Sequence, residues 1–210
     1  MNVFVLAPER SGTTTFFKAC SHITNYTVAH ETNQNSILRH FNMWYPDNHI
    51  EIDNRLTFNL GWLDLYHPNA YYVHLQRDLI NTATSLSKRY FNHGNVVRGY
   101  LDSIIGVRPE KVPDHHLFGV AMQFVNMTRY NIYAFLKGKK HMDFHIDIDP
   151  QNSFKKFWDA IGAEGDLNAA LAEFQIKHNA SRDRVKYLLW WEIKLVLLRL
   201  YRKWKLNRKI

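Results

Sequence analysis

The sequence predicts an α/β fold of three layers, in which a central parallel sheet is flanked by helices. One observation behind this prediction is a series of short runs with the length and composition of strands, near residues 3–7, 26–30, 49–53, 70–76 and 142–148. The other is that segments of helical character lie between and after them, near residues 13–22, 33–43, 60–66, 78–90, 115–137, 152–161, 166–173 and 182–206. Such alternation is typical of a parallel sheet with helices on both faces. With 46% hydrophobic residues, the 210-residue chain can form one catalytic domain over residues 1–210.

The first strand and the turn after it indicate an anion site. The apolar run Val3–Ala7 ends at Pro8, and the basic residue Arg10 precedes a run of small residues, Ser11-Gly12-Thr13-Thr14-Thr15. A strand, a tight turn and a helix start direct backbone N–H groups and the helix dipole to one point, which suits a phosphate or sulfate group. A magnesium-dependent ATP or GTP loop has a Lys before this Ser or Thr, and Gly12 is followed directly by Thr13. A simple helix N-cap at Ser11 or Thr13 is the alternative.

A second segment has the same chemical character. The predicted strand over 70–76 ends at Arg77, and the helix that follows carries Ser85, eight residues after the arginine. A guanidinium fork matches the geometry of a phosphate. Together, the turn around Gly12 and the Arg77–Ser85 pair resemble the cofactor site of sulfotransferases that use 3′-phosphoadenosine 5′-phosphosulfate (PAPS). The alternative is an ion pair of Arg77 with Asp78 at a helix start, and a solvated serine.

The resemblance implies a P-loop-like fold and a role for each of these residues. In this family the turn binds the 5′-phosphosulfate, and an Arg and a Ser with the spacing of Arg77 and Ser85 hold the 3′-phosphate. The chain has Asp78-Leu79 where the family often has Asn-Pro or Asp-Pro. Two weaker matches follow, an acidic turn with Pro150 before a short helix, and the segment 177–181, which is similar to a His-x-Asn-x-Ser segment of bacterial members. The resemblance covers roughly residues 1–182.

The chain resembles bacterial members more than the cytosolic branch, because it lacks the Arg-Lys-Gly-x-x-Gly stretch with which that branch grips the 3′-phosphate. The implied reaction moves the sulfuryl group of PAPS to an acceptor hydroxyl and releases 3′-phosphoadenosine 5′-phosphate (PAP), without a metal ion. Cations must then stabilise the leaving phosphate. The resemblance places Arg10 near the oxygen that bridges sulfur and phosphorus, and the threonines of the turn at the 5′-phosphate: Thr13, Thr14 and Thr15.

The transfer also needs a base that takes the proton of the acceptor hydroxyl. The position of the catalytic His of the cytosolic branch falls at Arg55, and an arginine cannot act as a base at neutral pH. Other members use a Glu just past the second strand, which corresponds to Glu31. We therefore expect Glu31 to be the base, with His30 second and Asp53 third. The alternative for Glu31 is an acid that stabilises a helix N-terminus.

Other features set limits on function. The twelve histidines show no zinc-binding spacing, so no metal site is expected. The single cysteine, Cys20, excludes an internal disulfide, and we expect a packed thiol. Residues 91–114 contain three glycines and two prolines among scattered charges. They predict a long loop, either one that closes over the acceptor or a disordered one.

The positive charge is concentrated in the last thirty residues. Residues 181–210 contain ten Lys and Arg against Asp183 and Glu192, and this surplus of eight equals the formal charge of the whole chain, +8. The segment 182–206 predicts a basic amphipathic helix, which can lie on an anionic membrane, join two copies of the chain or cover the core. Nucleic acid is not an expected partner. A cytoplasmic location is expected, since the chain begins directly with its first strand and has no uncharged apolar run of membrane-spanning length.

Two other functions remain open at this stage. A P-loop nucleotide kinase would share the fold, but it should show a Walker lysine and a magnesium-binding acid at a strand end. A non-catalytic scaffold associated with a membrane would explain the basic C-terminal segment and leave the Arg77–Ser85 spacing unexplained. The acceptor is open among carbohydrates, lipids and small molecules, because acceptor loops vary freely on a shared scaffold.

Overall fold

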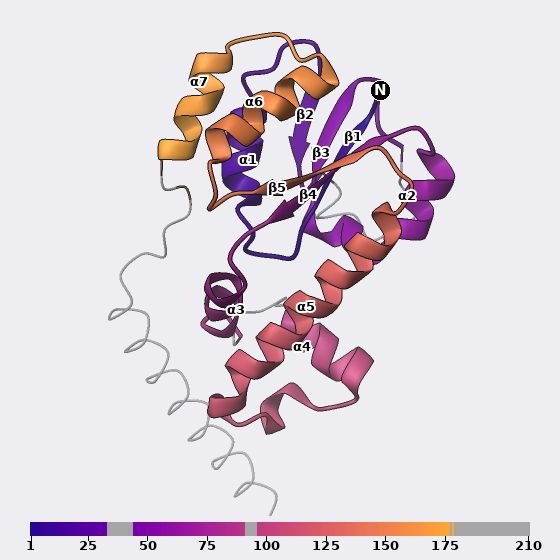
Figure 1. Cartoon of the computed structure of the whole chain (residues 1–210). Helices are drawn as coiled ribbons and strands as arrows, with labels where there is room; N and C mark the ends of the chain where they lie inside the picture. Colours follow the sequence, from indigo (N-terminus) through magenta and orange to yellow (C-terminus); the bar gives the residue numbers. More distant parts are fainter. Residues whose placement is uncertain (33–43, 91–95, 177, 179–210) are drawn as a thin grey trace, which may run out of the picture. The chain divides into compact units, whose positions relative to one another are not determined.

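A parallel sheet of five strands organises the protein. The computed structural model describes residues 1–32, 44–90, 96–176 and 178. The strands are β1 (Val3–Leu6), β2 (Thr27–His30), β3 (His49–Ile52), β4 (Tyr71–Gln76) and β5 (His141–His145). Their order across the sheet is β2-β3-β1-β4-β5, and every pair is parallel (Figure 1). All five predicted strands and the parallel sheet are confirmed.

The last strand is shorter than the predicted 142–148. It ends at His145, and the two aspartates that follow, Asp147 and Asp149, bind backbone N–H groups outside the sheet. Asp147 Oδ2 accepts a hydrogen bond from the N–H of Asp78 at 2.7 Å, and Asp149 Oδ1 accepts one from the N–H of Asn152 at 3.4 Å. Asp149 is thereby the N-cap of α6 (Pro150–Ile161), whose first residue is a proline.

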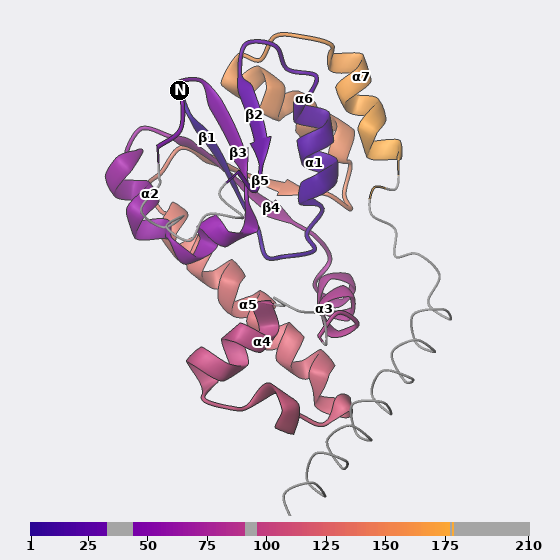
Figure 2. The ribbon, with the colours of Figure 1, turned by 180° about the vertical axis from the view of Figure 1, so that it is seen from behind.

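One face of the sheet is covered by α1 (Thr13–Cys20), α6 and α7 (Leu167–Ala172), the last followed by a short 3₁₀ turn, η6 (Glu173–Gln175) (Figure 2). The side chains that point to this face form one hydrophobic core, which includes Val3, Val5, Phe16, Ile50, Val73, Phe144, Phe154 and Phe157. The thiol of Cys20 is packed in this core, as expected, and burial raises its pKa well above the ordinary value.

The opposite face is covered by a 3₁₀ helix, η2 (Asn54–Phe58), by α2 (Leu60–Tyr66) and by the second half of the long helix α5 (Leu117–Leu136). Alternate strand residues supply the core on this side, with Phe4 and Leu6 of β1 and Tyr72 of β4 packed against Leu63, Ile132 and Leu136. The three-layer architecture is therefore confirmed: two helical layers enclose one sheet.

A third hydrophobic core lies outside the sheet. It joins the first half of α5 to α3 (Leu79–Ser87), to α4 (Val96–Tyr100) and to a π-helical turn, η3 (Leu101–Ile105). Two 3₁₀ turns, η4 (Pro109–Lys111) and η5 (Asp114–His116), precede α5. The prediction of a loop over 91–114 is thus wrong for residues 96–105, which are helical. Val97, Tyr100 and Leu101 have helical spacing and are buried, and the glycines and prolines of the segment concealed this pattern. The Tyr90 hydroxyl also holds the segment in place, because it donates a hydrogen bond to the carbonyl of Pro109 at 2.8 Å.

The strand order decides where a ligand is expected. The chain starts at β1 in the middle of the sheet, places β2 and β3 on one side of it, and then adds β4 and β5 on the other. In open parallel sheets of this kind, ligands bind beyond the carboxyl ends of the strands, where the order reverses. The predicted helices over 33–43 and 182–206 lie outside the described residues. Among the helices that are described, none combines the length and apolar character needed to cross a membrane.

Candidate active site

The turn between β1 and α1 forms a compact loop at the carboxyl end of the central strand. Arg10 and Gly12 both adopt left-handed backbone conformations, with φ of 71° and 94°. The glycine is needed there, because a Cβ at this position would collide with the side chain of Ile146. Ser11 is fully buried, and its Oγ has no hydrogen-bond partner among the described residues. A buried hydroxyl without a partner, beside the N–H groups of a helix start, suits an anion.

The loop is in contact with the second predicted segment. Arg10 Nε donates to Ser85 Oγ of α3 at 3.0 Å, and Arg77 Nη1 at the end of β4 donates to the carbonyl of Arg10 at 3.4 Å. The residues predicted to hold the 5′- and 3′-phosphates are therefore brought together from three elements. Arg77 Nε also lies 3.8 Å from Asp147 Oδ1. The backbone carbonyl of Arg77 accepts a hydrogen bond from Arg129 of α5.

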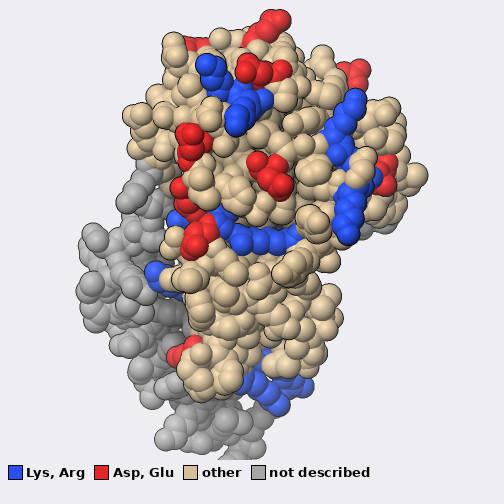
Figure 3. All heavy atoms as spheres, in the orientation of Figure 1, with Lys and Arg blue, Asp and Glu red and all other residues tan. Residues whose placement is uncertain are grey.

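Several arginines surround this point. The pKa of Arg10 is lowered, mainly by burial and further by the positive charges of Arg89 and Arg77. An anionic ligand would relieve this repulsion, so the arrangement favours a phosphate or sulfate. In the space-filling view, Lys and Arg lie beside Asp and Glu at mid-height of the face, below the part that contains the sheet (Figure 3).

The predicted bases lie at the neighbouring strand ends. Glu31 directly follows β2 with a left-handed φ of 56°, donates its N–H to the carbonyl of Ile52 at 3.1 Å, and accepts a hydrogen bond from Asn54 Nδ2 at 3.4 Å. His30 instead packs against α1, with its ring stacked on Phe17 at 5.4 Å. Asp53 caps η2, because its Oδ1 accepts the N–H of Arg55 at 2.8 Å, and burial raises its pKa. Of the two carboxylates, that of Glu31 accepts a bond from a side chain, Asn54, whereas that of Asp53 caps a helix.

Comparison with known proteins identifies the fold. No family model matches the chain, and neither does any curated protein. Among solved structures, mouse sulfotransferase SULT7A1 complexed with PAP is similar to it, with a TM-score of 0.53 and 13% sequence identity over 87% of this chain and 67% of that one. The chain has a sulfotransferase fold. The predicted P-loop-like α/β architecture is thereby confirmed.

Within this sulfotransferase fold, sequence reasoning missed one acidic residue. Glu9 lies in the loop beside Arg10, and burial raises its pKa. The charges of Arg10, Arg89 and Arg55 lower the pKa of Glu9, and the charge of Glu31 raises it further. An acid directly before the basic residue of an anion-binding turn is the signal that could have indicated it.

Glu9 gives a pH-dependent prediction. A carboxyl whose pKa is raised in the folded state binds its proton more tightly there, so the free energy of unfolding falls as the pH rises above the ordinary value of 4.5 and through the folded pKa. Glu9→Gln should therefore raise the melting temperature at about pH 7 and lose this advantage below about pH 4. Thermal melts at both pH values measure this change in melting temperature, and Glu110→Gln, at an exposed residue, is the control. An equal shift at both pH values would contradict the burial argument.

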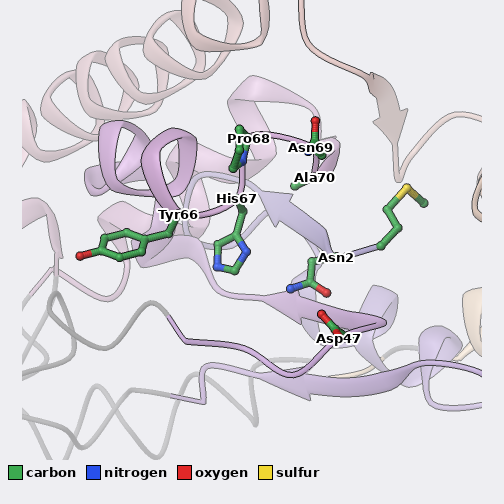
Figure 4. Close-up of a pocket in the computed structure, with 8 residues that line it drawn as sticks. Asn2, Asp47, Tyr66, His67, Pro68, Asn69 and Ala70 are labelled. Carbon is green, nitrogen blue, oxygen red and sulfur yellow. The ribbon is translucent and has the colours of Figure 1, made fainter.

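Two further observations concern other kinds of site. Among the described residues, no group of three or more His, Cys, Asp or Glu side chains is placed to hold a metal ion. A pocket at the opposite, amino edge of the sheet is lined by Met1, Asn2, Asp47, Tyr66, His67, Pro68, Asn69 and Ala70 (Figure 4). It contains none of the predicted site residues, so it belongs to a different part of the molecule.

Proposed function

We propose that the chain is a PAPS-dependent sulfotransferase, which moves the sulfuryl group from PAPS to the hydroxyl of a carbohydrate, lipid or small-molecule acceptor. One observation carries the proposal. Arg10 Nε bonds Ser85 Oγ, and Arg77 Nη1 bonds the carbonyl of Arg10, so two motifs that are distant in the sequence converge on one loop. The ribose of one nucleotide carries both a 5′- and a 3′-phosphate in PAPS, and a single ligand of this kind needs both sets of groups close together.

Each part of the loop then has a role. The N–H groups at the start of α1 and the hydroxyls of Ser11, Thr13, Thr14 and Thr15 would bind the 5′-phosphosulfate, with Gly12 allowing the close approach. Ser85 would exchange its bond with Arg10 for one with the 3′-phosphate, which Arg77 would bind through its guanidinium fork. Release of Ser85 leaves Arg10 Nε available for the bridging oxygen, where negative charge develops during transfer.

Glu31 completes the arrangement as the proposed base. Its carboxylate is at the carboxyl end of β2, where Asn54 donates to one oxygen and leaves the other able to accept the proton of an acceptor hydroxyl. Proton transfer and attack on sulfur need the hydroxyl between this carboxylate and the loop. His30, stacked on Phe17, and Asp53, which caps η2, are the second and third candidates.

Product analysis tests the proposal against a kinase. The full chain is incubated with PAPS and a panel of alcohols and phenols, and in parallel with ATP and magnesium. We expect PAP to form from PAPS, unaffected by a chelator, and ATP to remain intact. Formation of ADP from ATP in the absence of any PAP from PAPS would overturn the sulfotransferase proposal and favour the kinase. The location of the protein is a further proposal, and so is a contact of residues 182–206 with a membrane or with a second copy of the chain. Association with anionic vesicles tests the membrane contact, and the mass in solution tests the contact with a second copy.

A further inference from the structure

Glu51 is a charged residue buried inside the molecule. It lies on β3 and is 0% exposed, while its strand neighbours Ile50 and Ile52 belong to the core on the opposite face. Burying a carboxylate is costly unless hydrogen bonds compensate for the lost water. Glu51 has such bonds from two residues, Thr32 and His49. An apolar side chain at this position would avoid the cost of burying a carboxylate, so the bonds of Glu51 point to a role beyond packing.

The first partner, His49, anchors the carboxylate to the sheet. His49 Nε2 is 3.0 Å from Glu51 Oε2, and its Nδ1 is 2.8 Å from the hydroxyl of Thr27 on β2. The ring of Tyr45 stacks on the imidazole at 5.2 Å, and His49 is 4% exposed. The carboxylate is therefore held by a buried imidazole, which is itself bonded to a neighbouring strand and stacked on an aromatic ring.

The second partner, Thr32, is the residue directly after Glu31. Glu51 Oε1 accepts the backbone N–H of Thr32 at 3.0 Å, and Oε2 accepts its hydroxyl at 2.6 Å. On the other side, the N–H of Glu31 donates to the carbonyl of Ile52 at 3.1 Å. The backbone of Glu31 is thus held by β3 on both sides.

These anchors explain an unusual backbone conformation. Glu31 has a φ of 56°, a region that side-chain-bearing residues seldom adopt. Such a conformation persists when the surrounding bonds determine it, and residues of this kind gather at functional sites. With the backbone fixed in this way, the Glu31 carboxylate lies beside Asn54.

We propose that Glu51 is a positioning residue for Glu31. By holding Thr32, it fixes the left-handed turn that presents the Glu31 carboxylate at the carboxyl edge of the sheet. Glu51 acts through Thr32 and takes no proton from the acceptor. The inference rests on the proposed function for what Glu31 does there.

Two variants of the full chain test it, Glu51→Gln and Thr32→Val. The first removes the charge and keeps the shape; the second keeps Glu51 and removes the hydroxyl donor. Glu173→Gln is the matched control, because Glu173 also bonds a histidine, His22 Nε2, at 3.1 Å. A misplaced base lowers turnover without weakening nucleotide binding, so we expect kcat to fall by about ten-fold in both variants with an unchanged KM for PAPS. The control should retain both values.

A measurement that needs no turnover separates this inference from the proposed function. In protein labelled with ¹³C at glutamate carboxyls, the Glu31 signal is assigned by its loss in Glu31→Gln. We expect this signal to shift in Glu51→Gln and in Thr32→Val and to stay in place in Glu173→Gln. An unchanged Glu31 signal in both variants would overturn the positioning role. A wild-type chain that neither binds PAP nor transfers sulfate would overturn the proposed function, while the signals would still decide the role of Glu51.

Discussion

Glu31→Gln is expected to lower the turnover of sulfuryl transfer by at least about 100-fold, because a positioned general base typically contributes ~10²–10⁴-fold to a rate. The amide keeps the shape of the side chain and can still bond Asn54, but it cannot take the proton of a hydroxyl. Folding and nucleotide affinity should remain close to those of the wild type. The rate of PAP release from PAPS, with a surrogate phenol or water as acceptor, measures the effect.

Glu110→Gln provides the control for this variant, since Glu110 is an exposed acid paired with Arg98. Turnover of Glu31→Gln within a few-fold of the wild type would clear Glu31 of the role. His30 would then be tested in the same way, followed by Asp53, in the order in which they are proposed as alternative bases. A large loss of thermal stability in Glu31→Gln would instead indicate a structural duty for the carboxylate.

Arg77→Ala is expected to weaken the binding of PAP by roughly ten- to a hundred-fold, the usual cost of losing a charge-assisted contact of ~1.5–3 kcal/mol. Binding of adenosine 5′-monophosphate, which has no 3′-phosphate, should change far less. The bond from Arg77 to the carbonyl of Arg10 is long, at 3.4 Å, so its loss should have little effect on the loop. Stabilisation of each variant against heat by increasing nucleotide reports the affinities.

Arg98→Ala is the control for Arg77→Ala, because it also removes a partly exposed guanidinium that pairs with an acid. Ser85→Ala should weaken PAP binding in the same direction and by less, since it removes a single bond from an uncharged hydroxyl, whereas Arg77→Ala removes a charged fork. If Arg77→Ala weakened both nucleotides equally, the arginine would support the loop and would not read the 3′-phosphate.

The sheet was predictable because its signal is local. The central strand is a short apolar run beside a turn, at Val3–Ala7, the others are short segments between turn signals, and the parallel arrangement follows from the helices in between. The helical segment 96–105 was not predictable in this way. Its buried residues, Val97, Tyr100 and Leu101, are interrupted by Gly99, and their helical spacing becomes meaningful only when α3 and α5 are in place to cover them.

The candidate site was predictable in its composition and not in its contacts. The spacing of Arg77 and Ser85 resembles that of a 3′-phosphate site in sulfotransferases, but the bond between Ser85 and Arg10 depends on how α3 meets the loop. Glu9 was missed because its character comes from burial, which the sequence does not show at a loop position. The hold of Glu51 on Thr32 likewise depends on the alignment of β2 with β3.

In the proposed function, one site binds a nucleotide with phosphates at both the 5′ and the 3′ positions. Calorimetric titration of the wild-type chain with PAP and with adenosine 5′-monophosphate, without metal ions, tests it most directly, because the two ligands differ only in the 3′-phosphate. We expect PAP to bind at least about ten-fold more tightly than adenosine 5′-monophosphate. Equal affinities for the two nucleotides, or no detectable binding of PAP, would contradict it.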